Sequence, residues 1–237
     1  EFTNKYKTYQ LGYDAQAGEW RVGAAYEYSD GSLNYTSGSG ENKIGAISLY
    51  GTLQGKDNSA LDIVVKRGRI YGDMDIYGKY SDQGDYSTDA TSIGVEYSKR
   101  FDGGNNVYFE PQAQLTFGRI DGYDYVSAKG IRVAYDDINS LIGRLGIVGG
   151  KAFSRGDVYV KASLLHEFSG DSSVTMLAAN GESYMEDQDY GDTWLEVGIG
   201  GNITLGKNCE LYGEVERSFG GDVTKNWGAN VGFRYSF

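Results

Sequence analysis

Two carboxylates near the end of the chain have a spacing that could support acid–base chemistry. Glu214 and Glu216 are separated by one residue, so on an extended strand both side chains point to the same face. A pair of carboxylates in one site can act as a general acid and a general base. Two such residues also commonly line a polar channel, and no serine, histidine and aspartate set accompanies them. We therefore predict a lining role and assign no catalytic residue.

Few other residues offer the chemistry of a site. His166 is the only histidine, and its place beside Glu167 at the end of an alternating segment favours a structural role. The acidic stretch 186–192 could attract calcium, but it lacks the ligand spacing of an EF-hand and is typical of a solvated loop. The glycine-rich stretches 143–150 and 198–206 indicate strand packing rather than a phosphate loop. We therefore predict no metal site and no cofactor.

Composition narrows the class of protein. The chain has 237 residues, with 36 Gly, 21 Tyr and one Pro. It contains no run of 18 apolar residues, which excludes a transmembrane helix. The net charge of −11 and the absence of a basic patch exclude nucleic acid as a partner. The single Cys209 has no internal disulfide partner. No secretory signal peptide opens the chain, so we expect Glu1 to be a cut or processed start.

Alternating polarity is the dominant pattern in the sequence. In the last segment, Trp227, Val231 and Phe237 belong to an apolar set, and the intervening residues are polar or small. Successive strand residues point to opposite faces, and about nine to eleven tilted residues cross a bilayer. An apolar face toward lipid and a polar face toward a lumen are typical of a transmembrane barrel. Eleven segments alternate in this way, at 6–14, 20–28, 44–53, 60–70, 90–99, 107–119, 138–152, 157–168, 193–205, 209–218 and 227–237.

The sequence therefore predicts an all-β fold, a transmembrane antiparallel up-and-down β-barrel over residues 1–237. The connections alternate between short and long, with long ones at 29–43, 71–89, 120–137 and 169–192. Short periplasmic turns and longer outer loops are the rule for such barrels, which places the C-terminus in the periplasm. Bacterial barrels have an even number of strands, so the eleven readable strands suggest a twelfth before Glu1. In the alternative, a long loop is miscounted, and segment 71–89 extends its flanking strands above the membrane.

In each alternating segment, one set of alternate positions is polar or small, and we call this set the polar parity. Its residues are the candidates for the lining of the lumen. One interpretation is a hydrated lining of ion pairs that keeps the barrel rigid and wet. The other is that these groups grip a linker helix or let an extended polypeptide slide past. The predicted lumen-lining residues are Arg21, Glu27, Lys66, Glu96, Glu110, Gln112, Gln114, Arg144, Lys161, Glu196, Glu214, Glu216 and Arg234.

Two backbone features accompany this lining. Glycines such as Gly23, Gly198, Gly200 and Gly232 share the polar parity. They leave room either for a segment within the pore or for barrel curvature and bulky neighbouring side chains. Pro111 lies on the lipid parity within a strand, where it removes a ladder donor, so we expect a bulge or distorted pairing there.

Five motifs occur in an order that resembles a known family. They are Phe109-Glu-Pro-Gln-Ala-Gln-Leu115, Ser140-Leu-Ile-Gly-Arg-Leu-Gly146, Val158-Tyr-Val-Lys-Ala-Ser163 with Leu165-His-Glu-Phe168, Gly191-Asp-Thr-Trp-Leu-Glu-Val-Gly198 and Asn230-Val-Gly-Phe-Arg-Tyr-Ser-Phe237. Together they resemble the C-terminal translocator domain of autotransporters (type V secretion), and the resemblance covers essentially the whole chain.

The resemblance implies a twelve-stranded barrel in the bacterial outer membrane, with its long loops extracellular. It also implies a linker helix in the lumen, a covalently linked passenger upstream, and export of that passenger to the cell surface with help from the barrel-assembly machinery. The terminal residues Val231, Phe233, Tyr235 and Phe237 resemble the signal that this machinery recognises. The sequence departs from the family at its start, and we expect the first strand, the linker helix and the passenger to lie upstream of Glu1.

Two other functions fit the same pattern. A free-standing porin-like channel shares the polar lumen, although the sequence shows no obvious constriction loop. A surface adhesin or an outer-membrane enzyme would carry its activity on the outer loops, and the single histidine weighs against the enzyme. An upstream passenger and linker helix in the reading frame would favour the translocator.

Overall fold

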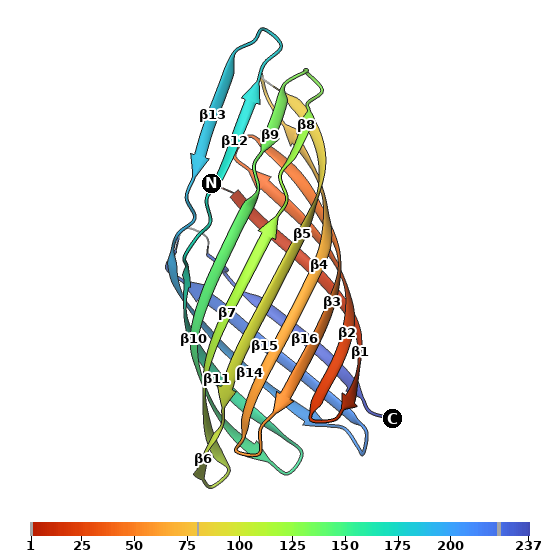
Figure 1. Cartoon of the computed structure of the whole chain (residues 1–237), viewed down its shortest axis with the longest axis vertical. Coiled ribbons are helices and arrows are strands. Elements are labelled where there is room, and N and C mark those ends of the chain that lie inside the picture. The colour runs from red at the N-terminus through yellow and green to blue at the C-terminus, as the bar shows by residue number, and fades with distance from the viewer. Residues whose placement is uncertain (1, 80, 222–223) are drawn as a thin grey trace.

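A computed structural model describes residues 2–79, 81–221 and 224–237 as a tall, curled antiparallel sheet with a smaller sheet above it (Figure 1). Consecutive strands of the large sheet pair in the order β1-β2-β3-β4-β5-β7-β10-β11-β14-β15-β16. Their bounds are β1 Phe2–Ala17, β2 Trp20–Tyr35, β3 Gly38–Gln54, β4 Ser59–Ile76, β5 Asp82–Lys99, β7 Val107–Ile120, β10 Ile138–Phe153, β11 Gly156–Glu167, β14 Thr193–Thr204, β15 Cys209–Phe219 and β16 Gly228–Tyr235. The expected all-β antiparallel fold is confirmed.

The polarity of this wall is the reverse of that of a soluble protein. Leu11 and Val231 are 81% and 80% exposed on the convex face, whereas the side chains buried on the concave face include Ser48, Ser163 and Ser218. Exposed apolar side chains on one face and small polar ones on the other suit lipid outside and water inside. Among the residues that the structure describes, no helix is long and apolar enough to cross a membrane.

The hydrophobic cluster of the protein lies in the smaller sheet, which has the order β13-β12-β9-β8. Tyr125, Val133 and Val174 form its centre. The ring of Tyr123 stacks on that of Tyr86 at 4.4 Å between centroids, which ties this sheet to β5. Burial raises the pKa of the Tyr123 phenol. The strands are β8 Tyr123–Val126, β9 Arg132–Tyr135, β12 Ser172–Leu177 and β13 Ser183–Gln188.

The short connections gather at the opposite end, where the C-terminus also lies (Figure 1). There β6 (Phe101–Gly104) pairs with β7 through a tight hairpin. Asn105 and Asn106 at its tip have φ angles of 53° and 60°. A two-residue hairpin turn of type I′ requires positive φ at both central positions, and asparagine tolerates that conformation better than most residues.

The long connections differ from the sequence-based expectation. Segment 29–43 was expected to be a loop, but β2 continues to Tyr35 and β3 begins at Gly38. In segment 71–89 the flanking strands β4 and β5 are also extended, as in the alternative interpretation. Segments 120–137 and 169–192 contain the hairpins of the smaller sheet. Above a membrane both faces of a strand meet water or other loops, so the alternation of polarity that reveals a membrane strand is lost there.

Pro111 distorts its ladder as expected. Strand β7 pairs with β5 up to Ser98↔Gln112, and the pairing resumes with β6 at Phe101↔Phe109. The interruption lies directly opposite Pro111, and the register on its two sides is the same. Because proline has no N–H to donate, the pairing of β7 is interrupted here, whereas on the opposite side the Arg100 N–H continues the register of β4 and β5 by donating to the Asn58 carbonyl at 2.9 Å.

Strands β1 and β16 form the two ends of the large sheet. Within the described ranges no ladder joins them. The rings of Tyr13 and Phe237 nevertheless stack across this seam at 5.9 Å between centroids. The expectation of a twelfth strand before Glu1 stays a prediction.

Candidate pore interior

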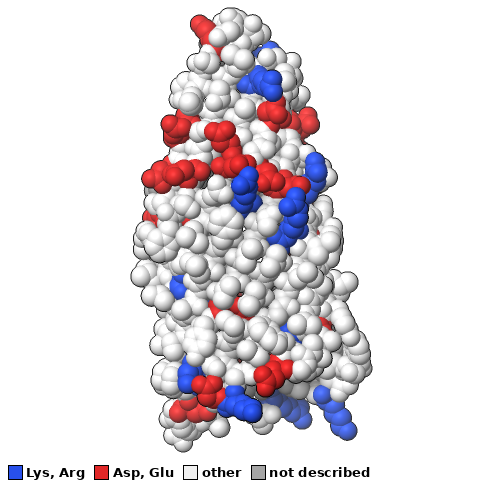
Figure 2. All heavy atoms as spheres, in the orientation of Figure 1, with Lys and Arg blue, Asp and Glu red and all other residues white. Residues whose placement is uncertain are grey.

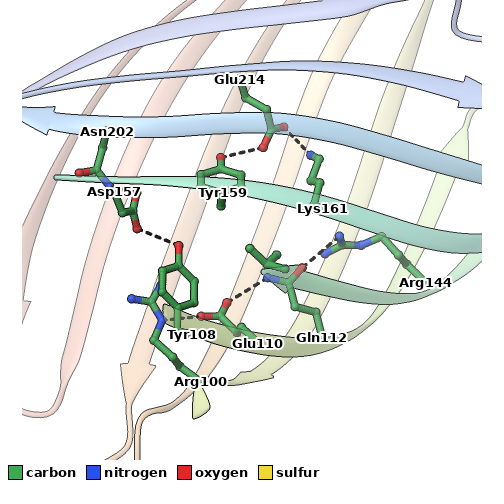
Figure 3. Close-up of a pocket in the computed structure, with 11 residues that line it drawn as sticks. Arg100, Tyr108, Glu110, Gln112, Arg144, Asp157, Tyr159, Lys161, Asn202 and Glu214 are labelled. Carbon is green, nitrogen blue, oxygen red and sulfur yellow. Dashed lines mark hydrogen bonds and ion pairs between the residues drawn. The ribbon is translucent and has the colours of Figure 1, made fainter. Parts of the chain in front are cut away.

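The concave face of the curled sheet carries the charged and amide side chains that the alternation selected (Figure 3). Each predicted lumen-lining residue forms a hydrogen bond or ion pair with another residue. Several of the partners lie two strands away, because side chains on the inside of a tightly curved wall converge. The lining residues thus form several separate clusters of hydrogen bonds and ion pairs, which we call polar groups.

Arg144 of β10 is the centre of one enclosed group. Its Nη2 lies 2.5 Å from Glu96 Oε2 on β5, and its Nε donates to Gln114 Oε1 at 2.7 Å. The Nη1 atom makes longer contacts of 3.4 Å with Gln112 and Ser163. Residues Glu96, Gln114 and Arg144 stand opposite one another in the ladders of β5, β7 and β10. The guanidinium therefore reaches across one strand and ties three strands together.

A second group surrounds Lys161 of β11. Its ammonium pairs with Glu214 and lies 3.0 Å from Glu216 Oε2. The Tyr159 hydroxyl donates to Glu214 Oε2 at 2.7 Å. Lys225 continues the chain of charges, with Nζ 2.7 Å from Glu216 Oε1 and 3.3 Å from Glu196 Oε1. The two carboxylates that suggested acid–base chemistry are thus held by lysines.

A third group lies toward the short-turn end and borders a cavity of about 360 Å³ (Figure 3). Glu110 accepts hydrogen bonds at 3.0 Å from Arg100 Nε and from Gln112 Nε2. On the facing side of the cavity, Asp157 accepts one from the Tyr108 hydroxyl at 2.9 Å and one from Asn202 Nδ2 at 2.8 Å. Hydroxyl, amide, carboxylate and guanidinium groups all face this cavity, so its lining is polar.

The remaining predicted residues form isolated pairs. Lys66 Nζ lies 2.8 Å from Glu27 Oε2 across β3. Near the short-turn end, Arg21 Nη1 lies 3.7 Å from Asp14 Oδ1. Arg234 Nη1 lies 3.9 Å from Glu210 Oε2 on the neighbouring strand. The basic side chains of these pairs are more exposed than Arg144, so the pairs contribute less to the stability of the wall.

The glycines of the polar parity are covered by neighbouring side chains. A Cβ built on Gly200 would lie 2.5 Å from the Tyr159 hydroxyl, and one on Gly232 would lie 2.1 Å from Tyr212 Cζ. Gly198 lies under Lys161 in the same way. The space left by the missing side chains is therefore taken up by tyrosine and lysine from the next strand. This arrangement corresponds to the interpretation in which these glycines accommodate bulky neighbours.

Sequence reasoning missed several members of the polar groups. Tyr108 and Tyr159 share the parity of Glu110 and Lys161 in their strands, which was the available signal for them. The predicted lining contains only charged and amide residues, so tyrosines at the same alternate positions were not included. Lys225 lies outside any alternating segment, so no periodicity could reveal it.

Other residues with site chemistry have structural partners. His166 Nδ1 lies 2.7 Å from Thr193 Oγ1, and the His166 ring packs edge-on against Phe168. Within residues 2–79, 81–221 and 224–237, no group of three or more His, Cys, Asp or Glu side chains is arranged to hold a metal ion. The predicted assembly residues Val231, Phe233, Tyr235 and Phe237 are exposed on the convex side of the terminal strand.

A family model for the autotransporter beta-domain matches residues 1–216. The chain belongs to the autotransporter β-domain family. The resemblance read from the five motifs is therefore confirmed. As an autotransporter β domain, the chain is a translocator barrel of the bacterial outer membrane, and family membership favours this reading over a free-standing porin-like channel or adhesin.

Individual relatives agree with this assignment. Pertactin autotransporter of Bordetella parapertussis is 29% identical over 248 residues, which cover 100% of this chain and 26% of that protein. The chain thus spans about a quarter of the length of this curated relative. The crystal structure of the β domain of the Bordetella autotransporter BrkA matches with a TM-score of 0.77 at 24% identity, covering 100% of this chain and 92% of that one. The translocator domain of NalP from Neisseria meningitidis matches with a TM-score of 0.81 at 13% identity, covering 100% and 82%.

Proposed function

We propose that this β domain anchors and helps to export an N-terminal passenger domain that is covalently linked upstream through a linker helix. Family membership supports the proposal, and the inverted polarity of the wall carries it physically. An apolar convex face holds the domain in outer-membrane lipid, whereas a concave face of hydroxyls, amides and paired charges surrounds a hydrated interior. A polypeptide can cross such an interior without burying its backbone groups in hydrocarbon.

We further propose that the paired charges are what makes this interior suitable for passage. Arg144 and Lys161 are each neutralised by carboxylates on nearby strands, so neither presents a free charge that would retain an oppositely charged segment. The pairs also tie strands together around the wall. The lumen-lining residues therefore keep the barrel rigid and wet while a linker helix or an extended chain occupies it.

The orientation follows from the two unlike ends. The hairpins β8–β9 and β12–β13 form the larger end, which by the rule for outer-membrane barrels is extracellular. The short turns and the C-terminus then face the periplasm. Protease added to whole cells should cleave at the tip of the β12–β13 hairpin near Asn180, and it should spare the turn at Asn105. Cleavage of intact cells at the short turns would reverse this orientation.

The terminal strand is proposed to be the part that the barrel-assembly machinery recognises. Val231, Phe233, Tyr235 and Phe237 are exposed on one face, and Phe237 lies beyond the last residue of β16. Deletion of Phe237 should lower the amount of assembled protein in the outer membrane much more than it lowers unfolding stability in detergent. Trp227→Ala is the matched control, since Trp227 is also an exposed aromatic residue of this segment. Normal outer-membrane levels of the deletion would contradict the signal role.

We infer no catalytic role for the concave face. Glu214 and Glu216 could supply acid–base chemistry only if one of them were free to exchange protons with a substrate, and both are paired with Lys161. A Glu214→Gln variant should leave the processing state of the passenger unchanged. A change in passenger cleavage in this variant would instead assign Glu214 a part in that reaction.

The export function is tested with the full-length protein. An epitope tag within the region upstream of the β domain should be accessible to antibody on intact cells. The same tag should stay inaccessible when strands β14–β16 are deleted, because the wall then cannot form. Surface exposure of the tag without these strands would contradict the proposal. High, steady ion conductance of the full-length protein in planar bilayers would favour the porin-like alternative.

A further inference from the structure

Three arginines point outward from the convex face. At the outward-facing positions lower on the same strands, the side chains are apolar and suit contact with lipid. Arg67 and Arg69 belong to β4, and Arg119 belongs to β7. Their side chains are 65%, 54% and 45% exposed, respectively. None of them takes part in the polar groups of the concave face. We call these three residues the convex arginine row.

The row lies at the upper edge of the apolar band. On β4, Arg67 and Arg69 follow Val65 at alternate positions, so they share its face. On β7, Arg119 follows Phe117 in the same way. Val65 and Phe117 are exposed. The aliphatic and phenylalanine side chains of the convex face therefore end at the convex arginine row on both strands, and on β4 the exposed Tyr71 lies beyond it.

Strand register aligns the row around the barrel. Arg67 stands opposite Thr91 of β5, and Thr91 stands opposite Arg119 of β7. Two inter-strand spacings put the backbones of Arg67 and Arg119 about 10 Å apart. Figure 2 shows basic and acidic side chains gathered above a broad band in which few charged side chains reach this face of the molecule.

Neighbouring side chains orient the guanidinium groups without covering them. Arg67 Nη2 donates to Asp89 Oδ2 at 3.0 Å. Arg69 Nη2 donates to Ser87 Oγ at 3.0 Å. Arg119 contacts Asp121 and Asp137 at 3.0 and 2.6 Å. Each guanidinium has five N–H donors, so these bonds leave donors free on each exposed side chain.

We propose that the convex arginine row binds the phosphate groups of anionic lipid headgroups in the adjoining leaflet. Guanidinium binds phosphate through paired, charge-assisted hydrogen bonds. A lipid whose acyl chains lie on Val65, Ile93 and Phe117 would hold its headgroup at the level of the arginines. The proposed orientation of the barrel decides only which leaflet of the membrane the arginines face. In that orientation the leaflet is the outer one, and the ligand is its phosphorylated glycolipid.

The carboxylates of the same region set the specificity of the interaction. Asp89, Asp121 and Asp137 repel a phosphate that approaches from their side, so the ligand must meet the free edges of the guanidinium groups. A freely diffusing phosphate lacks the acyl chains that would position it there. The proposal therefore commits to a lipid rather than to a soluble phosphate compound.

The test compares lipid binding by the full-length protein and a triple variant, Arg67→Gln, Arg69→Gln and Arg119→Gln. Both are purified from outer membranes in nonionic detergent and mixed with a bis-phosphorylated glucosamine-based lipid, and the bound copies are counted by native mass spectrometry. Each exposed guanidinium should contribute a factor of about two to five in affinity. The triple variant should therefore bind this lipid at least about tenfold more weakly. The dephosphorylated lipid should bind equally weakly to both proteins.

Matched variants separate this interaction from general effects of charge. Arg132 is also exposed and paired with an aspartate, Asp124, at 2.7 Å, but it belongs to the smaller sheet above the barrel. Arg132→Gln should bind the lipid as the unmodified protein does. Three Arg→Lys changes in the row keep the charge and lose the paired geometry, so their effect should be intermediate. Heat-modifiable migration on gels establishes that each variant is folded.

Several outcomes would overturn the proposal. If the triple variant binds the lipid as tightly as the unmodified protein, the arginines form ion pairs with their aspartate neighbours and do not bind the lipid. Loss of binding in EDTA would mean that a divalent cation on the carboxylates, rather than the guanidinium groups, holds the phosphate. If millimolar inorganic phosphate displaces the lipid, the acyl chains do not contribute to recognition, and the proposal of a lipid ligand is wrong. These outcomes are independent of passenger export, which is measured on cells with the epitope tag.

Discussion

The ion pair between Arg144 and Glu96 should contribute more to the stability of the barrel than the more exposed pair between Lys66 and Glu27. The side chains are 16% and 22% exposed, and Arg144 also donates to Gln114 at 2.7 Å. Breaking a fully buried pair by removing one partner costs roughly 3–5 kcal/mol. Because this pair borders a hydrated interior, we expect Arg144→Met to lower the free energy of unfolding by about 2 kcal/mol. The unpaired Glu96 carboxylate causes most of this loss.

A double-mutant cycle isolates the pair from the other contacts of Arg144. Arg144→Met, Glu96→Gln and the double variant are unfolded reversibly in urea with the protein in lipid vesicles. The coupling free energy should be about 1.5–2 kcal/mol. The reference cycle uses Lys66→Met and Glu27→Gln, whose ion pair is 2.8 Å long with a lysine side chain that is 38% exposed. That coupling should be about 0.5 kcal/mol.

The comparison of the two cycles is the decisive result. If Arg144 and Glu96 couple no more strongly than Lys66 and Glu27, enclosure by the wall does not strengthen the pair. The concave face would then behave as an open surface in water. A coupling near zero for both pairs would remove the role of ion pairs in tying the strands together.

Three further predictions concern the convex face, the glycines and the smaller sheet. Val197→Arg, near the middle of the apolar band, should lower the free energy of unfolding in lipid vesicles by roughly 2–4 kcal/mol. Ile203→Arg, near the membrane interface, should lower it by about 1 kcal/mol or less. Equal losses would contradict the placement of Val197 deeper in the membrane than Ile203. Gly200→Ala should slow folding into vesicles, because its Cβ would lie 2.5 Å from the Tyr159 hydroxyl, and Tyr159→Ala should restore the rate; no rescue would refute the steric cause. Burial raises the pKa of Tyr123 above 10.0, so its contribution to stability is full below pH 10 and is lost as the pH rises through the raised pKa. Tyr123→Phe should reduce the tyrosinate absorbance that appears well above pH 10, and an unchanged titration would contradict the burial.

The membrane strands could be predicted from the sequence because lipid and water impose opposite demands on their two faces. In β14, Leu195 and Val197 alternate with Glu196 and Gly198, and the strand was expected at 193–205 and lies at Thr193–Thr204. The extended upper parts of β2 and β3 escaped prediction for the same physical reason. Where both faces of a strand meet water, polarity no longer alternates, and a strand resembles a loop.

The composition of the pore interior was predictable, but its pairings were not. Parity placed Glu96 and Arg144 on the polar face, yet they are 48 residues apart and meet only through the registers of β5, β7 and β10. Period-two alternation contains no information on register. The packing of the Tyr159 side chain over Gly200 also depends on register, because the two residues must stand opposite one another on adjacent strands.

The central claim is that lipid surrounds the convex face while water fills the concave side. Single spin labels at positions 195 to 200 of β14, in a Cys209→Ser background and in lipid vesicles, test it most directly. Labels at 195, 197 and 199 should be accessible to oxygen, which concentrates in lipid, and labels at 196, 198 and 200 should be accessible to a water-soluble relaxation agent. Equal accessibility at neighbouring positions, or the opposite alternation, would contradict the account.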